Sequence, residues 1–181
     1  ELGIIIETNG TLITESLARY MKENSTLNFI SVSLDGANAE THDSFRSVKG
    51  SFEQALSGIH YLVDAGFRPQ VIMSLHKGNV NEIEPLVRLA ERIGAGSVKF
   101  NLVNSTGRGQ TMNQRGELID IEGLLKIGKW VEGDLQRTSN IDLFYSWPLA
   151  FYGIKHLLHY GQYSCKIHNI LGILSTGQLS M

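Results

Sequence analysis

Cysteine is scarce in this sequence, because Cys165 is the only one among 181 residues. A single thiol cannot close an internal disulfide or a multi-thiolate metal site, and it favours a reducing, cytoplasmic compartment. No run of about 18 apolar residues is present, so we expect no membrane-spanning helix. The net charge is −2 and no basic stripe occurs, which argues against nucleic acid and anionic membranes as partners.

An initiator methionine is also lacking, and the chain enters an apolar run at its second residue. The first residues show neither the basic leader nor the cleavage pattern of a signal peptide. We therefore expect the sequence to be part of a longer protein. A hydrophobic fraction of 42% and a charged fraction of 19% are typical of a chain that folds around a packed core.

Short apolar runs rich in Ile, Val and Phe predict strands that are buried on both faces of a parallel sheet. They span residues 3–7, 28–34, 69–75 and 97–103. Segments with helical periodicity separate or follow these runs. The first and the last comprise residues 14–22 and 119–135. Of the two between them, one begins with a capping box of Ser51 and Gln54 and ends at Gly66, and the other begins with Asn81 as its N-cap.

Alternating strands and helices predict an α/β layer with parallel strands. Two architectures fit: an open doubly wound sheet, or an arc of a β/α barrel, since four strands cannot close a barrel of eight. The pattern changes after about residue 140. We therefore assign residues 1–140 to the α/β domain. We assign residues 141–181 to a small C-terminal subdomain with a linker helix and a hairpin over 170–181.

Ligands of parallel α/β layers bind where the strands end. All four predicted strand ends are polar and contain glycine, which suits a small polar ligand, although such residues are also ordinary loop formers. The motifs of dinucleotide-binding proteins, P-loop proteins, zinc proteases and serine hydrolases are missing. The strand ends read Thr8-Asn9-Gly10, Ser33-Leu34-Asp35-Gly36, His76-Lys77-Gly78-Asn79 and Asn104-Ser105-Thr106-Gly107-Arg108-Gly109.

Two further motifs lie between these strand ends: His42-Asp43-x-x-Arg46 and Gly50-Ser51-Phe52. The order and spacing of the whole set resemble those of the radical S-adenosylmethionine enzymes. The order is most similar to the branch with a C-terminal, cysteine-rich SPASM-type domain. That branch includes the coenzyme PQQ (pyrroloquinoline quinone) synthesis protein, peptide-modifying maturases and anaerobic sulfatase maturases. The resemblance extends over nearly the whole chain, from about residue 3 to residue 181.

The resemblance implies a partial (β/α)6 TIM-type barrel, of which this chain would hold about four parallel β/α units, strands three to six. It implies S-adenosylmethionine and a [4Fe–4S] cluster as cofactors, an electron donor, and a peptide or small-molecule substrate. In the family a C-x-x-x-C-x-x-C motif supplies the thiolates that such a cluster requires. This chain has no cysteine before Cys165, so we expect it to be inactive by itself.

The resemblance assigns four residues to the cofactor. Ser33 would bind the ribose or carboxylate of S-adenosylmethionine, and Arg46 would bind its carboxylate, since a guanidinium holds a carboxylate in a fork. The backbone of Val103 and Asn104 would contact the adenine. Arg46 has a second interpretation, in which it only bridges to a helix carboxylate.

Strand-end residues complete the candidate site. Thr8 and Asn9 join the cofactor-binding set, with Thr8 pointing toward substrate. Asp35 and Lys77 are the catalytic candidates. As alternatives, a strand-end aspartate often accepts hydrogen bonds from a loop or helix cap, and Lys77 can be solvated.

Cys165, with Gly172 and Gly177, matches the start of a SPASM-type domain, which implies that Cys165 ligates an auxiliary iron–sulfur cluster in the intact protein. An inert buried thiol is the alternative. Two competing functions stay open: a non-redox module for a small adenosine- or phosphate-bearing ligand, and a structural partner without catalysis. An apolar edge on the first strand predicts that the chain dimerises there.

Overall fold

Five strands form one parallel sheet in which each strand pairs with its neighbour along the chain. The computed structural model describes residues 3–147, 172–173 and 178–180. The strands of the sheet are β1 (Ile4–Thr8), β2 (Leu27–Ser33), β3 (Gln70–Leu75), β4 (Ser97–Leu102) and β5 (Asp142–Tyr145). A separate antiparallel pair comprises β6 (Gly172–Ile173) and β7 (Leu179–Ser180), where the sequence predicts a hairpin.

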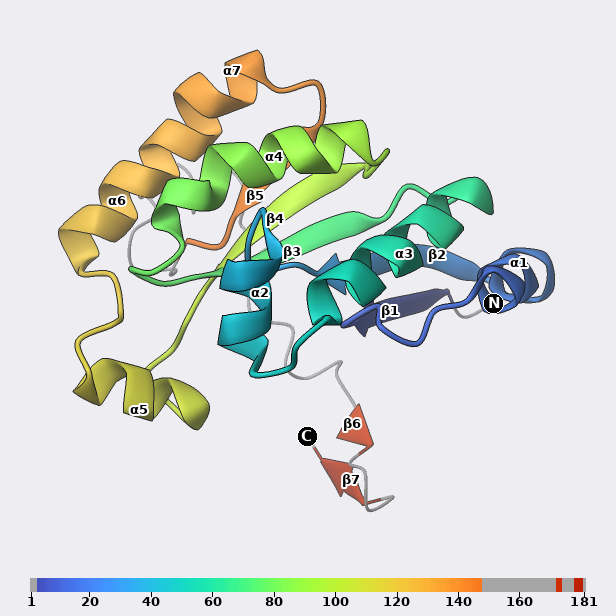
Figure 1. Ribbon diagram of the computed structural model, residues 1–181, viewed down its shortest axis with the longest axis horizontal. Coiled ribbons are helices and arrows are strands. Elements are labelled where there is room, and N and C mark those ends of the chain that lie inside the picture. The colour runs from blue at the N-terminus through green and yellow to red at the C-terminus, as the bar shows by residue number, and fades with distance from the viewer. Residues whose placement is uncertain (1–2, 148–171, 174–177, 181) are drawn as a thin grey trace. The chain divides into compact units, whose positions relative to one another are not determined.

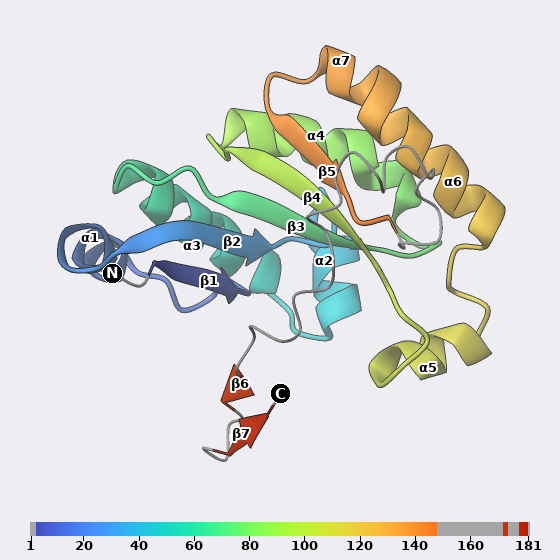
Figure 2. The ribbon, with the colours of Figure 1, turned by 180° about the vertical axis from the view of Figure 1, so that it is seen from behind.

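Helices connect the strands of the sheet. They are α1 (Glu15–Asn24), α2 (Ala39–Arg46), α3 (Ser51–Asp64), the 3-10 turn η1 (Val80–Glu82), α4 (Ile83–Arg92), α5 (Arg108–Gln114), α6 (Ile121–Trp130), the π-helical turn η2 (Val131–Leu135) and α7 (Gln136–Thr138). Helices α3, α4 and α6 lie in front of the sheet in Figure 1, and the strands lie in front in the reverse view of Figure 2. The helical layer therefore covers one face of the sheet.

The strand order decides between the two predicted architectures. A doubly wound sheet reverses its order and carries helices on both faces, whereas a β/α barrel keeps consecutive strands adjacent with its helices outside. This chain has the second arrangement. The predicted α/β class and partial TIM-type barrel are confirmed, with five strands where the sequence indicated four.

Side chains alternate between the two faces of the strands, as the pleat of a strand requires. Those on the face toward the helices form the core, and Val32, Val71, Met73, Val98 and Phe100 are fully buried there. A Cβ at Gly10 would meet Val32 at 2.6 Å and the backbone of α3 at 3.5 Å, so a glycine is needed where the chain turns after β1. The other face lines the inside of the barrel arc.

Three predicted details are corrected. The domain predicted to end at 140 gains β5, and the chain divides into compact units after Ser146. Helix α3 is capped by Gly50 rather than by a Ser51–Gln54 box, because Ser51 Oγ donates to Asp43 instead. Asn81 lies inside the 3-10 turn η1 and does not cap α4.

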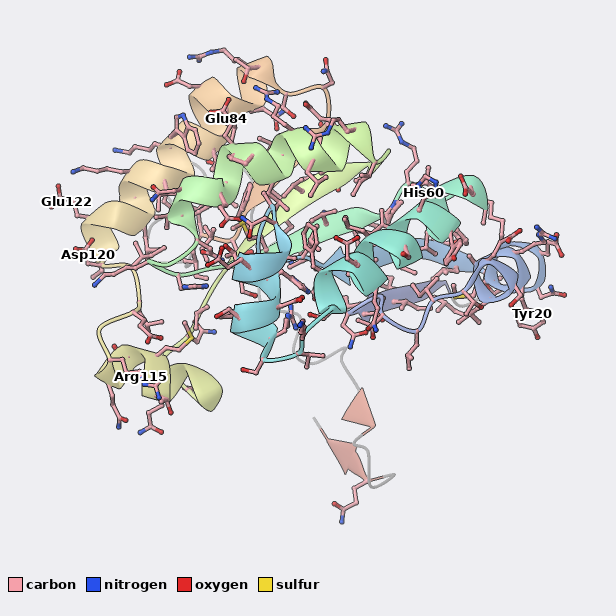
Figure 3. The ribbon with its side chains drawn as sticks, viewed as in Figure 1. Tyr20, His60, Glu84, Arg115, Asp120 and Glu122 are labelled. Atoms are coloured by element: carbon pink, nitrogen blue, oxygen red, sulfur yellow. The ribbon has the colours of Figure 1, made fainter. Side chains whose placement is uncertain are left out.

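The outer surface of the helical layer is charged. Glu84, Asp120 and Glu122 project from it at the positions labelled in Figure 3. Within the described residues no helix is long and apolar enough to cross a membrane.

Asp43 of α2 is the anion at the N-terminus of α3. Its carboxylate accepts the N–H of Gly50 at 2.5 Å, the N–H of Phe52 at 2.8 Å and the hydroxyl of Ser51 at 2.9 Å. These backbone hydrogen bonds, that of Gly50 first, hold the pKa of Asp43 below its ordinary value of 3.8. The charged carboxylate therefore joins α2 to α3 and complements the dipole of α3.

We predict that Asp43→Asn lowers the thermal midpoint by about 2–4 °C at pH 7. A carboxyl with a lowered folded-state pKa stabilises the fold above its unfolded pKa, and this contribution is lost as pH falls through the folded-state value. The gap between wild type and variant should therefore close as the pH falls below the ordinary pKa of 3.8 and then through the lower folded-state pKa. Thermal melts followed by circular dichroism measure it. Asp64→Asn, at the other end of α3, is the control. A gap that persists in acid would refute the assigned role of the charge.

The β1 edge of the sheet is apolar and exposed, since Ile4 is 43% and Ile5 is 68% accessible. Unpaired strand edges of this kind promote association between chains. We predict that the 181-residue chain self-associates and that Ile5→Lys shifts it toward monomer, because a charge opposes edge pairing. Sedimentation velocity at several concentrations measures this, and a wild-type chain that stays monomeric throughout would contradict it.

Candidate functional site

The carboxyl ends of β2 and β3 meet at Asp35, which is fully buried. Its Oδ2 accepts Arg46 Nε at 2.6 Å and contacts Arg46 Nη2 at 2.5 Å, while its Oδ1 accepts the N–H of Ser74 at 2.8 Å. The two carboxylate oxygens thus join the residue after β2, the last turn of α2 and a residue of β3. Asp35 is the centre of the rim that the strand ends form.

The backbone of Asp35 is also engaged on both sides. Its N–H donates to His42 Nδ1 at 3.0 Å, and its carbonyl accepts Asn79 Nδ2 at 2.9 Å. Burial lowers the pKa of His42, the nearby Asp35 carboxylate opposing this, so the imidazole is neutral and accepts at Nδ1. Asn79, which is fully buried, also donates to the carbonyl of Ser74 and accepts the N–H of His76. Asp35 is therefore held in place by His42 and Asn79, whose hydrogen bonds fix the backbone on both sides of it.

Arg46 lies beside Asp35, although the sequence assigns the two residues separate roles. The Arg46 side chain is 30% exposed. Nε and Nη2 contact the carboxylate, whereas Nη1 has no partner among the described residues. A guanidinium presents five N–H donors in a fixed plane, so an arginine held on one edge keeps donors available on the other.

Ser33 lies on the face of β2 that is turned away from the helices, two positions before Asp35. Its hydroxyl has no hydrogen-bond partner within the described part of the chain. Thr8 is paired with Val32, so the register turns Thr8 toward the helical layer, contrary to the expected orientation toward substrate. Thr8 Oγ1 accepts the N–H of Gly10, and Asn9 Oδ1 accepts the N–H and hydroxyl of Thr11. Both side chains stabilise the turn after β1.

Lys77, the second catalytic candidate, is exposed and holds the segment after α5. Its Nζ donates to the carbonyl of Gly116 at 2.7 Å, and its N–H donates to the carbonyl of Glu117 at 2.9 Å. The ammonium therefore neutralises the partial negative charge of carbonyls beyond a helix C-terminus. This contact attaches the α5 segment to the end of β3.

The turn after β4 brings the backbone of Val103 and Asn104 close to Gly109. A Cβ at Gly109 would collide with the carbonyl oxygen of Asn104 and would meet Val103 Cγ1 at 3.1 Å. Only glycine permits this close approach of the two segments.

His76 is a rim residue that the sequence did not single out. Its ring stacks on Phe45 with centroids 4.8 Å apart and planes at 12°. Nδ1 accepts the N–H of Gly78, and Nε2 is buried without a hydrogen-bond partner in the described structure. Burial lowers the pKa of His76, so it is neutral with its proton on Nε2. A histidine after an apolar run carries no signal of this stacking, because Phe45 is distant in sequence.

Metal ligands are not gathered in the part of the chain that the structure describes. No group of three His, Cys, Asp or Glu side chains there could hold a metal ion. Cys165 lies outside the described residues. The residues present therefore do not fit a [4Fe–4S] cluster, which needs thiolates.

Residues 1–90, about half of the chain, match the Radical SAM superfamily. An AdoMet-dependent heme synthase of Methanosarcina barkeri is 38% identical over 113 residues, which are 62% of this chain and 32% of the relative. A protein of the same name from Nitratidesulfovibrio vulgaris is 34% identical over 142 residues, 78% of this chain and 38% of the relative. AlbA, a subtilosin biosynthesis protein of Bacillus subtilis, is 36% identical over 107 residues, which are 59% of this chain and 24% of AlbA. This chain thus spans between about a quarter and two fifths of the length of these curated relatives.

Solved structures share the fold. Streptococcus suis SuiB bound to S-adenosylmethionine aligns with a TM-score of 0.72 at 16% identity, covering 97% of this chain and 41% of SuiB. The enzyme anSMEcpe with bound AdoMet aligns with a TM-score of 0.62 at 15% identity, covering 89% of this chain and 44% of that one. Members of this superfamily are enzymes that use S-adenosylmethionine and a [4Fe–4S] cluster. The sequence match and the barrel arc agree, and the chain belongs to the radical S-adenosylmethionine superfamily.

Proposed function

We propose that this chain is the cofactor-binding and substrate-facing part of a radical S-adenosylmethionine enzyme that modifies a peptide or a cofactor precursor. One observation carries the proposal: at the rim of the barrel arc, a buried carboxylate fixes the guanidinium of Arg46. Such a guanidinium suits a carboxylate-bearing cofactor. The names of the relatives support the substrate class, since they are heme synthases and a bacteriocin biosynthesis protein. Coenzyme PQQ synthesis, the branch that the motifs resemble, stays a prediction within this class.

The rim residues fit S-adenosylmethionine. Arg46 would hold its carboxylate through Nη1, Ser33 would hydrogen-bond its ribose or carboxylate, and the backbone of Val103 and Asn104 would meet its adenine. When bound and reductively cleaved, S-adenosylmethionine supplies a 5′-deoxyadenosyl radical that removes hydrogen from a substrate. The chain's own contribution is to bind and orient the cofactor over the strand ends.

Asp35 takes a different role in this proposal from the one its sequence position suggested. It is fully buried and both its oxygens accept hydrogen bonds, which leaves no geometry for accepting a proton from substrate. We assign Asp35 as a positioning residue for Arg46. Lys77 holds the α5 segment through its ammonium, and its catalytic role rests only on the family resemblance.

The [4Fe–4S] cluster requires thiolates that residues 1–164 do not contain. We propose that they come from parts of the protein outside this sequence, since the chain covers only about a third of its relatives. Cys165 stays a predicted ligand of an auxiliary cluster. A protein electron donor and a reducing, cytoplasmic location belong to the same proposal.

We predict that the natural gene product containing this sequence, purified anaerobically and reconstituted, binds several irons per chain. With dithionite and S-adenosylmethionine it should form 5′-deoxyadenosine, measured by chromatography and mass spectrometry. The 181-residue chain by itself should form none, because it lacks the thiolates. Absence of both iron and 5′-deoxyadenosine in the longer protein would overturn the radical enzyme and favour a non-redox binding module.

We predict that Arg46→Lys in the longer protein weakens S-adenosylmethionine binding about ten-fold, the cost of about one charge-assisted hydrogen bond. A lysine is a point charge and cannot contact Asp35 and the cofactor carboxylate together. Equilibrium dialysis measures the affinity, and a melt checks the fold. Arg19→Lys is the control, because within the described part of the chain Arg19 pairs only with Glu15, on the exposed face of α1. An unchanged affinity in Arg46→Lys would refute the assignment.

A further inference from the structure

A second polar region lies on the inner face of the sheet, toward the amino-terminal ends of the strands. A groove there has a volume of about 630 Å³, within the range of about 300–1,000 Å³ that small-molecule sites occupy. All five strands contribute to it, and every lining residue belongs to the compact unit before Trp147. Its lining residues do not include Asp35 or Arg46 of the rim, whereas Lys99 lies in the same register row as Ser33, with Ile72 between them.

Five polar residues pair in register, one from each strand: Glu7, Ser31, Gln70, Ser97 and Asp142. Gln70 and Ser97 form the floor of the groove, Glu7 and Asp142 lie at its outer margins, and Ser31 lies beside it without lining it. Gln70 is 6% exposed, and its Nε2 donates to Ser97 Oγ at 3.0 Å. Ser31 is fully buried, and its Oγ has no hydrogen-bond partner in the structure as described. A core that served only stability would place apolar side chains along this row.

Lys99 is the half-buried cation of the groove. It lies on β4, one step above the polar row, between Ile72 of β3 and Phe144 of β5 in register. No described residue forms an ion pair or hydrogen bond with its ammonium. An ammonium that is partly withdrawn from water gains from an anionic partner, and the protein places none against it.

The two carboxylates of the groove are positioned differently from Lys99. Glu7 and Asp142 are exposed on the outermost strands, where water satisfies them. Arg68 adds a second cation at the entrance, where Gly96 lies close: a Cβ at Gly96 would meet the Arg68 carbonyl oxygen at 2.8 Å. The interior of the groove is therefore cationic and its outer margins are acidic.

We propose that this groove is a substrate subsite in which Lys99 binds a carboxylate, while Phe29 and Phe144 contact the apolar body that carries it. The inference rests on the proposed function in calling the ligand a substrate. Gln70 and Ser97 supply further polar contacts on the floor. A tetrapyrrole with propionate side chains and a peptide with acidic residues both carry this chemistry, and the probes below separate them.

The test uses the natural gene product and two probes: coproporphyrin III, followed by its absorbance band, and a pentapeptide of alternating glutamate and phenylalanine, followed by calorimetry. Lys99→Met keeps the aliphatic stem and should weaken binding of the recognised probe about ten-fold. Lys99→Arg should restore it to within about two-fold, because the charge returns. Lys126→Met is the control, since Lys126 lies on the exposed side of α6 and pairs with Glu122.

Each outcome of these binding measurements either supports or overturns the subsite. Lys99-dependent binding of the porphyrin supports a tetrapyrrole substrate, and Lys99-dependent binding of the peptide supports a peptide substrate. Binding that Lys99→Met leaves unchanged, or no binding of either probe, overturns the subsite. S-adenosylmethionine affinity, measured in the same variants, should be unaffected by Lys99→Met. Lys99-dependent binding in a protein that forms no 5′-deoxyadenosine would overturn the proposed function and leave the carboxylate site standing.

Discussion

The contact between Asp35 and Arg46 determines the geometry of the rim. Asp35 is fully buried, and a buried carboxylate without a cation is costly, so removing either partner of such a pair typically destabilises a protein by about 3–5 kcal/mol. The same carboxylate accepts the N–H of Ser74, and the backbone around it is held by His42 and Asn79. One charge pair thus fixes α2 against the ends of β2 and β3.

The sequence predicted the regular part of the fold well because long apolar runs have one interpretation in an α/β layer. The boundaries of the first four strands lie within one residue of their predicted ranges. β5 was missed because its four residues begin with an aspartate and alternate between exposed and buried. Helix α2 was missed because His42 is its only buried residue, so no apolar periodicity marks it.

The candidate site was harder to predict, since it depends on contacts between segments distant in sequence. The family resemblance, and no local pattern, placed Ser33 at the cofactor. The face on which Thr8 lies follows from its pairing with Val32, which no local pattern contains. The pairing of Asp35 with Arg46 joins residues from a strand end and a helix end. Lys77 reaches a carbonyl 39 residues away. The residue types predicted the chemistry of the rim, whereas the hydrogen-bond partners of these residues could be identified only from the fold.

The two polar regions of the barrel arc differ in how their groups are satisfied. At the rim, Asp35, Asn79 and His42 satisfy one another, so Arg46 is oriented before any ligand arrives and little ordering remains to oppose binding. In the groove, the ammonium of Lys99 has no partner among the described residues, so an incoming ligand supplies the contact. A preorganised rim suits a cofactor that is the same in every turnover. A groove whose ammonium has no protein partner suits the substrate. A ligand without the matching carboxylate would leave the ammonium of Lys99 withdrawn from water and unpaired, and would therefore bind less well.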